Sequence, residues 1–347
     1  MLDACDWFVP ATSTAPPRVW VIAELGVNHD GCVDRAIALT RAAKVAGADA
    51  VKLQRFEPER LLSNQAQLAG YQAGQAADAG ALLRSLTLDL DAMRAVRHAA
   101  HAAGLAFVVT PFSLPDVADL AALGADAVKL ASPDAVNLPL LREASGLGVP
   151  MLLSTGTCEL AELEPAAALL KQHAPGGCLI QCVSSYPTPA EAAALGGIAA
   201  LADRFGLPVG YSDHTQSMLT GALAVAGGAV VLEKHLTHDR TAKGPDHATS
   251  LEPDALAEYV AQARLATAML GPRAKTLLPI ERDVQQVSRQ SLCATRDLPA
   301  GHVLSRDDLT IKRPGTGLPA AQLDQTLGKR LARAVQDNDL LQLDDLA

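Results

Sequence analysis

The chain has 347 residues, of which 49% are hydrophobic and 19% are charged, and its formal net charge is −9. This is the composition of a globular protein with a large core, and the acidic balance disfavours a nucleic-acid partner, which needs clustered lysine and arginine. No apolar stretch approaches the ~20 residues of a membrane span, so a cytoplasmic protein with no membrane partner is expected.

Residues 1–17 are predicted to form an N-terminal tail. Short apolar runs then alternate with Ala/Leu-rich segments of helical periodicity. This rhythm continues across residues 18–271 and predicts an α/β fold, a (β/α)8 TIM barrel, with an open doubly wound sheet as the alternative. The predicted strands cover residues 19–23, 50–53, 106–109, 127–130, 151–153, 178–182, 208–211 and 229–232.

Three further segments depart from the barrel rhythm. Residues 57–86 are too long for an ordinary strand-to-helix connection and are expected to form a lid or insertion beside the site. Residues 272–287 are predicted to be a linker. Residues 288–347 combine short strands with turn sequences such as DLPAG at 297–301, and we expect a small, β-rich separate domain there.

In a TIM barrel the chemistry lies at the carboxyl ends of the strands. Lys52 and Lys129 lie there, and buried lysines are costly unless they meet anions. They indicate a phosphate or carboxylate ligand, helped by the hydroxyls of Ser132, Ser154 and Ser212. In a second interpretation each lysine pairs with a neighbouring Glu or Asp and only stabilises the barrel. A Schiff-base lysine is a third possibility.

Two histidines, His214 and His235, follow the seventh and eighth strands. As a pair at adjacent strand ends they favour a divalent metal ion that also binds substrate oxygens and water, and the alternative is two hydrogen-bonded core residues. Glu24 ends an otherwise apolar strand, which indicates an acid/base group or a group that orients substrate and water. For His29 and His247, the roles of ligand, substrate contact and loop residue stay equally open.

The ordered set of strand-end motifs resembles the sialic acid synthase (N-acetylneuraminate synthase) family, whose members make nonulosonic acids. The segment from residue 289 to RPGTG at 313–317 is similar to the antifreeze-like SAF domain of that family. Each motif alone is weak, whereas the ordered set is specific. The motifs are IAELGVNH (22–29), VKLQ (51–54), TPF (110–112), KLAS (129–132), STG (154–156), YPTP (186–189), GYSDHT (210–215), EKH (233–235) and GPDH (244–247).

The resemblance implies a metal-dependent condensation. Carbon 3 of phosphoenolpyruvate attacks the open-chain aldehyde of an N-acylated hexosamine such as N-acetylmannosamine, water adds at carbon 2, and phosphate leaves through C–O cleavage. Mn²⁺ or Mg²⁺ would lie on His214 and His235, with Glu24, Lys52 and Lys129 as further catalytic residues. The substrate-binding residues would be Gln54, Ser132, Asp134, Ser154, Ser184, Tyr186, Ser212, Asp246 and Arg313.

The resemblance also implies a domain-swapped homodimer. In it, Arg313 would reach the partner's barrel and touch the N-acyl group of the sugar; without the resemblance, Arg313 is an exposed arginine in a turn. The sequence departs from the family pattern at Ser184 and around Asp134. These departures leave a diamino sugar, as used by legionaminic or pseudaminic acid synthases, as an alternative acceptor. A lysine Schiff-base aldolase and a non-catalytic carbohydrate-binding protein are the more distant alternatives.

Overall fold

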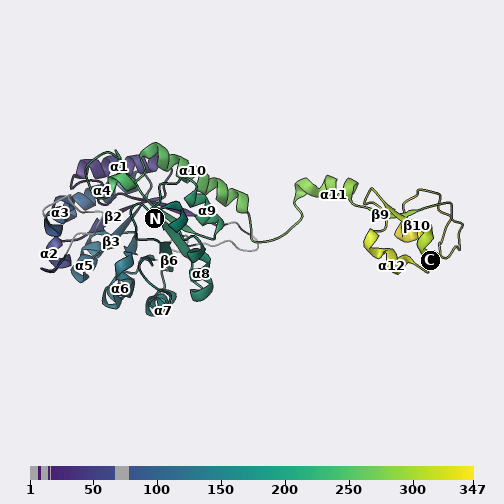
Figure 1. The fold of residues 1–347 in the computed structure, drawn as a ribbon, viewed down its shortest axis with the longest axis horizontal. Coiled ribbons are helices and arrows are strands. Elements are labelled where there is room, and N and C mark those ends of the chain that lie inside the picture. Colours follow the sequence, from purple (N-terminus) through teal and green to yellow (C-terminus); the bar gives the residue numbers. More distant parts are fainter. Residues whose placement is uncertain (1–6, 9–14, 16, 67–77) are drawn as a thin grey trace. The chain divides into compact units, whose positions relative to one another are not determined.

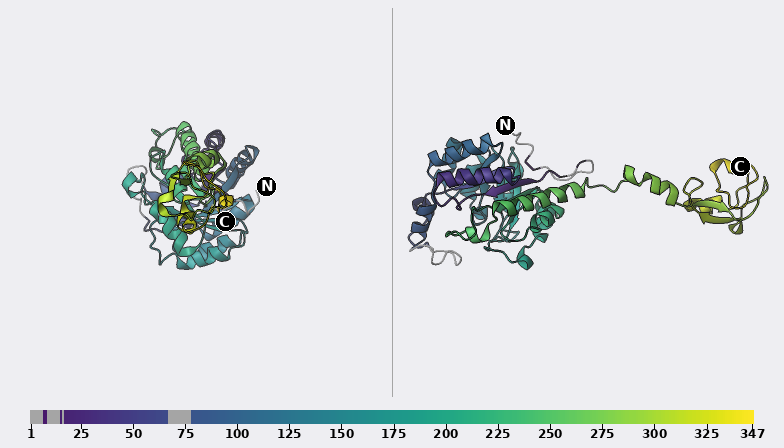
Figure 2. Two further views of the ribbon diagram at one scale, coloured as in Figure 1. Left: turned by 90° about the vertical axis from the view of Figure 1, so that its right-hand side faces the viewer. Right: turned by 90° about the horizontal axis from the view of Figure 1, so that it is seen from above.

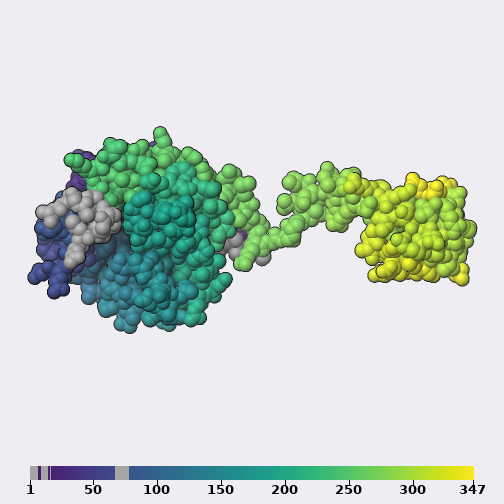
Figure 3. All heavy atoms as spheres, viewed as in Figure 1, coloured from purple at the N-terminus to yellow at the C-terminus, as the bar shows by residue number. Residues whose placement is uncertain are grey.

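A computed structural model describes residues 7–8, 15, 17–66 and 78–347 of the chain. The chain divides into two compact units, one ending at Ala274 and the other beginning at Lys275. Figures 1 and 3 show both units. No helix in the described part of the chain is long and apolar enough to cross a membrane.

The first unit is a closed barrel of eight parallel strands (Figure 1). Because β1 pairs with both β2 and β8, the sheet has no edge, which confirms the (β/α)8 prediction and excludes an open sheet. Nearly every strand residue is buried, as expected for parallel strands covered by helices. They are β1 (Trp20–Glu24), β2 (Ala50–Arg55), β3 (Ala106–Pro111), β4 (Ala127–Leu130), β5 (Met151–Ser154), β6 (Gly177–Cys182), β7 (Val209–Asp213) and β8 (Val231–His235).

Helices cover the outside of the barrel, as the side view in Figure 2 shows. Local signals fix their ends: the Ser113 side chain caps the start of α5, and Gly124 ends it in the left-handed conformation. The helices are α1 (Val33–Val45), α4 (Leu90–Ala102), α5 (Leu114–Leu123), α6 (Leu138–Ser145), α7 (Glu164–Gln172), α8 (Gly196–Phe205), α9 (Thr220–Ala226) and α10 (Pro253–Leu270), with 3-10 turns η3 (Ser132–Val136), η4 (Ala190–Ala192) and η5 (His247–Thr249).

The segment after β2 differs from an ordinary connection, as the sequence predicts. It carries two short helices, α2 (Pro58–Leu61) and α3 (Ala79–Leu86), before α4 begins. The Asp78 side chain caps α3 by accepting a hydrogen bond from the Ala81 N–H. Residues 67–77, between the two helices, lie outside the described residues.

The N-terminal segment contributes a buried side chain to the barrel. Trp7 is 2% exposed and stacks on Trp20 of β1, with the ring centroids 4.2 Å apart. Both indoles belong to an apolar cluster with Ile22, Val108 and Leu152. Residues predicted to be only a tail thus include an anchor that packs against the barrel strands.

The second unit has its own core around Leu292, Leu298 and Leu331. Its sheet pairs two antiparallel strands, and short helical turns surround it. The region predicted to be a linker, residues 272–287, contains one 3-10 turn and most of a helix. The elements are η6 (Pro279–Glu281), α11 (Arg282–Ser288), β9 (Ser291–Ala294), η7 (Arg306–Asp308), β10 (Leu309–Lys312), η8 (Ala320–Gln322), α12 (Leu323–Thr326) and η9 (Leu343–Asp345).

Candidate active site

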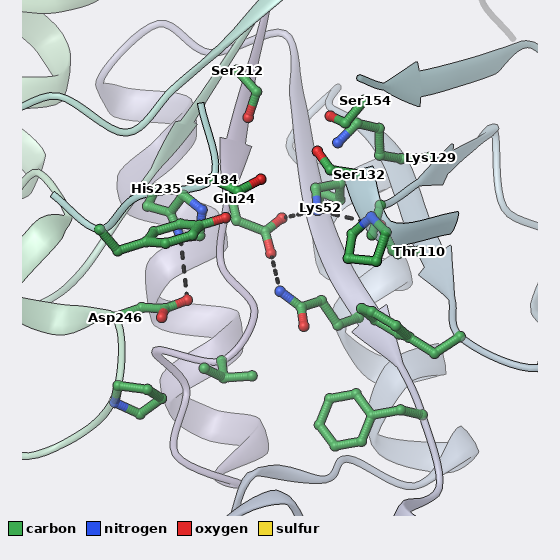
Figure 4. A pocket seen from close by; sticks show the side chains of 18 of the residues that line it. Glu24, Lys52, Thr110, Lys129, Ser132, Ser154, Ser184, Ser212, His235 and Asp246 are labelled. Atoms are coloured by element: carbon green, nitrogen blue, oxygen red, sulfur yellow. Dashed lines mark hydrogen bonds and ion pairs between the residues drawn. The ribbon is translucent and has the colours of Figure 1, made fainter. Parts of the chain in front are cut away.

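A cavity of about 470 Å³ opens at the carboxyl ends of the barrel strands (Figure 4). Every predicted site residue except Asp134 and Arg313 lines it. The residues so brought together are Glu24, Lys52, Gln54, Lys129, Ser132, Ser154, Ser184, Tyr186, Ser212, His214, His235 and Asp246.

Buried ion pairs form the floor of this cavity. Lys52 Nζ lies 2.7 Å from Glu24 Oε2, and Lys129 Nζ lies 3.2 Å from Glu233 Oε2. A longer contact of 3.8 Å joins Lys52 to Glu233. The geometry is compatible with two interpretations from the sequence, anion binding and pairing with a neighbouring carboxylate. Each lysine pairs with a carboxylate, and each also lines an open cavity.

The two floor carboxylates have opposite pKa shifts. Burial raises the pKa of Glu24, and the opposing effect of Lys52 does not outweigh it. Burial also acts to raise the pKa of Glu233, but the charges of Lys129 and Lys52 outweigh it and lower that pKa to about 2. Glu233 therefore stays ionised at neutral pH, whereas Glu24 is the carboxyl group suited to exchanging a proton.

His214 is held as a neutral imidazole. Its Nδ1 lies 2.7 Å from the carbonyl oxygen of Val183, which can only accept, so Nδ1 carries the proton. Burial, together with the charge of His235, lowers the pKa of His214 to about 3. The lone pair of Nε2 is left on the side of Ser212, whose Oγ is 3.4 Å away.

His235 lies opposite a carboxylate, and Figure 4 shows it beside Asp246. The Nδ1 atom is 3.4 Å from Asp246 Oδ2, an ion-pair contact longer than an ordinary hydrogen bond, and the buried Nδ1 has no hydrogen-bond partner among the described residues. Burial acts to lower the pKa of His235, but Asp246 and the floor carboxylates outweigh it and raise the pKa. The rings of His214 and His235 are 5.5 Å apart between centroids.

These two imidazoles have the features of a two-nitrogen metal site. The Val183 carbonyl fixes the tautomer of His214 and leaves Nε2 free to ligate, which is the usual outer-shell support of a metal-bound histidine. Within the described residues, no group of three or more His, Cys, Asp and Glu side chains is placed to hold a metal ion. Any ion here would therefore take its remaining ligands from substrate and water.

Small side chains crowd the ends of β4, β5 and β6. Ser132 Oγ accepts a hydrogen bond from the Gly156 N–H at 3.1 Å and lies 3.0 Å from Cys182 Sγ. A Cβ at Gly156 would lie only 2.5 Å from Ser184 Oγ, so glycine is required for this close approach. The result is a corner of hydroxyl groups on the same floor as Lys129, which suits an anionic ligand.

The predicted residues away from the cavity have other surroundings. Asp134 lies in η3, accepts a hydrogen bond from Asn137 at 3.0 Å, and has its pKa raised by burial. Arg313 is exposed in the second unit. His29 is a buried loop residue whose Nδ1 accepts from the Gly31 N–H, and His247 is the buried first residue of η5, with its Nε2 3.0 Å from Asp30.

Sequence reasoning did not select several residues that line the cavity. Glu233 was one, although alternation along β8 places it on the same face as His235. Thr110, which accepts a hydrogen bond from Lys52 at 3.3 Å, was another. Cys182, Phe56, Phe112 and apolar residues of α3 also line the cavity. The described parts of the insertion therefore lie beside the site, where the sequence placed them.

The barrel, its strand-end cavity and the appended small unit define the class of nonulosonic acid synthases. Residues 39–275 match the NeuB family and residues 289–347 match the SAF domain. The chain belongs to the NeuB family and carries a C-terminal SAF domain.

Relatives with specific names match almost the whole chain. An N,N'-diacetyllegionaminic acid synthase of Legionella pneumophila is 35% identical over 90% of both chains. A human N-acetylneuraminate-9-phosphate synthase is 33% identical, covering 93% of this chain and 91% of its own length. The crystal structure of an N-acetylneuraminic acid synthetase from Leptospira borgpetersenii, in complex with citrate, is 31% identical with a TM-score of 0.70, covering 77% of this chain and 90% of that one. These relatives are all synthases, and their names specify different sugar acids.

Proposed function

We propose that this protein condenses phosphoenolpyruvate with the open-chain aldehyde of an N-acylated hexosamine, such as N-acetylmannosamine, and water. The products are a nine-carbon 2-keto sugar acid and phosphate. The observation that carries this proposal is the floor of the cavity, where Lys52, Lys129 and a corner of hydroxyl groups lie beside two histidines. The synthase names of the relatives support it.

The floor supplies a site for the two anionic groups of phosphoenolpyruvate. Lys52 and Lys129 would bind its phosphate and carboxylate together with Ser132, Ser154 and Ser212. In the structure these lysines pair with Glu24 and Glu233, and the ion pairs orient both ammonium groups. Burial alone would lower the pKa of Lys52, but Glu233 and Glu24 outweigh it and raise that pKa.

Glu24 has the position and the pKa of a proton-transfer group. The new bond forms between carbon 3 of phosphoenolpyruvate and the aldehyde carbon, whose oxygen gains a proton. Water then adds at carbon 2, loses a proton, and the bond from carbon 2 to the phosphate oxygen breaks. The raised pKa of Glu24 suits it to both proton transfers, and Gln54, which donates to Glu24 Oε1 at 2.8 Å, fixes the carboxyl group.

His214 and His235 would hold the Mn²⁺ or Mg²⁺ ion. When bound, such an ion polarises a carbonyl oxygen and organises water. Asp246 would keep the ring of His235 in position from a distance of 3.4 Å and bind a sugar hydroxyl with its other oxygen. Tyr186, whose ring centroid is 4.1 Å from that of His214, and Ser184 would contact the acceptor above the two imidazoles.

We further propose a domain-swapped homodimer in which Arg313 reaches the partner subunit's cavity. Exposed apolar side chains on either side of the unit boundary support an association. Ile280, Val284 and Val287 are 83%, 56% and 60% exposed around α11, and Leu265 and Met269 are exposed on one face of α10. Surfaces of this kind are typical of interfaces.

Phosphate release tests the function. Purified protein with phosphoenolpyruvate, N-acetylmannosamine and Mn²⁺ should release phosphate, and a chelator should stop the release. His214→Ala should abolish it while the urea unfolding midpoint stays close to that of the unaltered protein. Absence of phosphate release with every N-acylated hexosamine tried would contradict the proposal, and sugar binding without release would favour the carbohydrate-binding alternative.

Two further experiments test the alternative chemistry and the dimer. Borohydride trapping of a substrate adduct on Lys52 or Lys129 would support a Schiff-base aldolase; we expect none, because Glu24 and Glu233 hold both lysine side chains in ion pairs. Mixing Arg313→Ala with Glu24→Ala subunits should restore part of the activity if the swap occurs. Mixtures as inactive as the separate variants would contradict the swap.

A further inference from the structure

The loop that follows β6, residues 183–188, holds His214 at two points. The carbonyl oxygen of Val183 lies 2.7 Å from His214 Nδ1. The N–H of Thr188 donates a hydrogen bond of 2.9 Å to the carbonyl oxygen of His214. One short segment therefore contacts both the imidazole ring and the main chain of a proposed metal ligand.

Thr188 is the most buried residue of this loop. Its exposed fraction is 3%, whereas Ser184, Ser185 and Pro187 are exposed. The loop contains neither helix nor strand, so no regular ladder of hydrogen bonds fixes its position. Its place beside His214 depends instead on individual contacts, and those of Thr188 are shielded from water.

The side-chain hydroxyl of Thr188 ties the loop to itself. Its Oγ1 donates to the carbonyl oxygen of Ser185 at 2.8 Å and lies 3.4 Å from the carbonyl oxygen of Val183. The N–H of Ser185 donates to the same Val183 carbonyl at 2.9 Å. Together with the two bonds to His214, these bonds form a closed chain that starts and ends at the Val183 carbonyl.

We propose that Thr188 is a positioning residue, whose hydroxyl holds the Val183 carbonyl where it fixes the ring of His214 and leaves Nε2 available to a metal ion. The inference rests on the proposed function and deepens it. Thr188 is not among the described residues that line the cavity, so it acts through His214 rather than by touching substrate. Without the hydroxyl the loop can rearrange, and the ring then loses the acceptor that selects its tautomer.

Two substitutions at this position separate the hydroxyl from the shape of the side chain. Thr188→Val keeps the branched shape and the N–H but removes the hydroxyl, whereas Thr188→Ser keeps the hydroxyl. Thr40→Val is the matched control, because Thr40 is also buried and its hydroxyl donates to the carbonyl oxygen of Ala36 at 2.8 Å within α1. Both valine variants lose one buried hydrogen bond, so their urea unfolding midpoints should fall by similar amounts.

The direct readout is Mn²⁺ binding in the absence of substrates, followed by the electron paramagnetic resonance signal of the free ion. Thr188→Val should weaken binding by about 10-fold, the lower end of the usual effect of altering a group that orients a metal-bound histidine. Thr188→Ser and Thr40→Val should stay within about twofold of the unaltered protein. Excess Mn²⁺ should restore most of the phosphate release of Thr188→Val.

A second readout reports on the ring itself. In metal-free protein with ¹⁵N-labelled histidine, nuclear magnetic resonance shows which ring nitrogen carries the proton, and His214→Gln identifies the signals of His214. We expect the proton on Nδ1 in the unaltered protein and in Thr188→Ser, and a mixture of the two tautomers in Thr188→Val.

The outcomes separate this inference from the function on which it rests. An unchanged Mn²⁺ affinity or an unchanged His214 tautomer in Thr188→Val would overturn the positioning role and leave the proposed function standing. If only the KM for the acceptor rises, the hydroxyl orients Ser184 and Tyr186 instead, and the proposal is wrong. Unaltered protein that neither binds Mn²⁺ nor releases phosphate would overturn the proposed function, whereas the tautomer would still show whether Thr188 fixes the ring.

Discussion

Two buried lysine–carboxylate pairs each use one residue of β8, and they face opposite sides of the barrel wall. Lys129 and Glu233 are 3.2 Å apart on the inner side and line the cavity. Lys234 and Asp213 are also 3.2 Å apart, but they face outward, where Lys234 lies 5.4 Å from the ring centroid of Tyr259 in α10. The two pairs thus have the same separation and are both buried, but only the inner pair lines the cavity.

A substitution in the outer pair should have the largest effect, and that effect is on stability. Lys234→Met removes the cation from beside Asp213, which is almost completely buried, and leaves an uncompensated charge. We expect the free energy of unfolding to fall by about 3–5 kcal/mol in urea titrations, with kcat/KM per folded molecule unchanged. Adding Asp213→Leu should recover much of the stability. A loss of activity at unchanged stability would place this pair in the chemistry and remove the distinction.

A substitution in the inner pair should lower activity strongly and stability only slightly. Lys129→Met removes one of two ammonium groups from the floor, and we expect phosphate release to fall by about 100- to 1000-fold in kcat/KM, the usual effect of deleting a charge-stabilising donor. Lys52 at 3.8 Å still compensates Glu233, so the unfolding midpoint should change less than in Lys234→Met. Unchanged kcat/KM would show that the floor does not bind the reacting anion.

The same contrast shows how far the sequence predicts this site. Alternating apolar runs located the strands, and their polar ends placed Lys52, Lys129, His214 and His235 at one opening. Period-two alternation would also have placed Glu233 at this opening beside His235, because residues two apart in a strand share a face, but that step was not taken. The inner role of Glu233 and the outer role of Lys234 follow from the same rule.

Local sequence patterns could not predict contacts between segments that lie far apart in the chain. His247 contacts Asp30, which lies 217 positions away in the sequence. Trp7 gained its place from Trp20, although residues 1–17 show no periodicity. The sequence predicted an insertion beside the site, but it did not predict that Leu82 and Leu86 of α3 would pack against Val27 and Phe56.

A buried group outside the cavity also gives a pH test. Burial lowers the pKa of His29 to about 4 from an unfolded value of 6.5, so below pH 6.5 the unfolded chain binds a proton that the folded chain does not. Stability should therefore fall as the pH falls from 6.5 to 4, by about 3 kcal/mol for this residue. In urea titrations, His29→Asn should be less pH-dependent than the unaltered protein by this amount. Identical slopes would mean that His29 titrates normally.

The smallest expected effect compares two residues of η3. Ser132 lines the cavity, whereas Asp134 does not line it and accepts from Asn137. Ser132→Ala should raise the KM for phosphoenolpyruvate by about 5- to 10-fold through loss of one hydrogen bond. Asp134→Asn keeps an acceptor for Asn137 and should change either KM less than about twofold. A comparable rise in KM in both variants would instead favour the family-based assignment of Asp134 to substrate binding. Lining the cavity would then be too narrow a criterion for a binding residue.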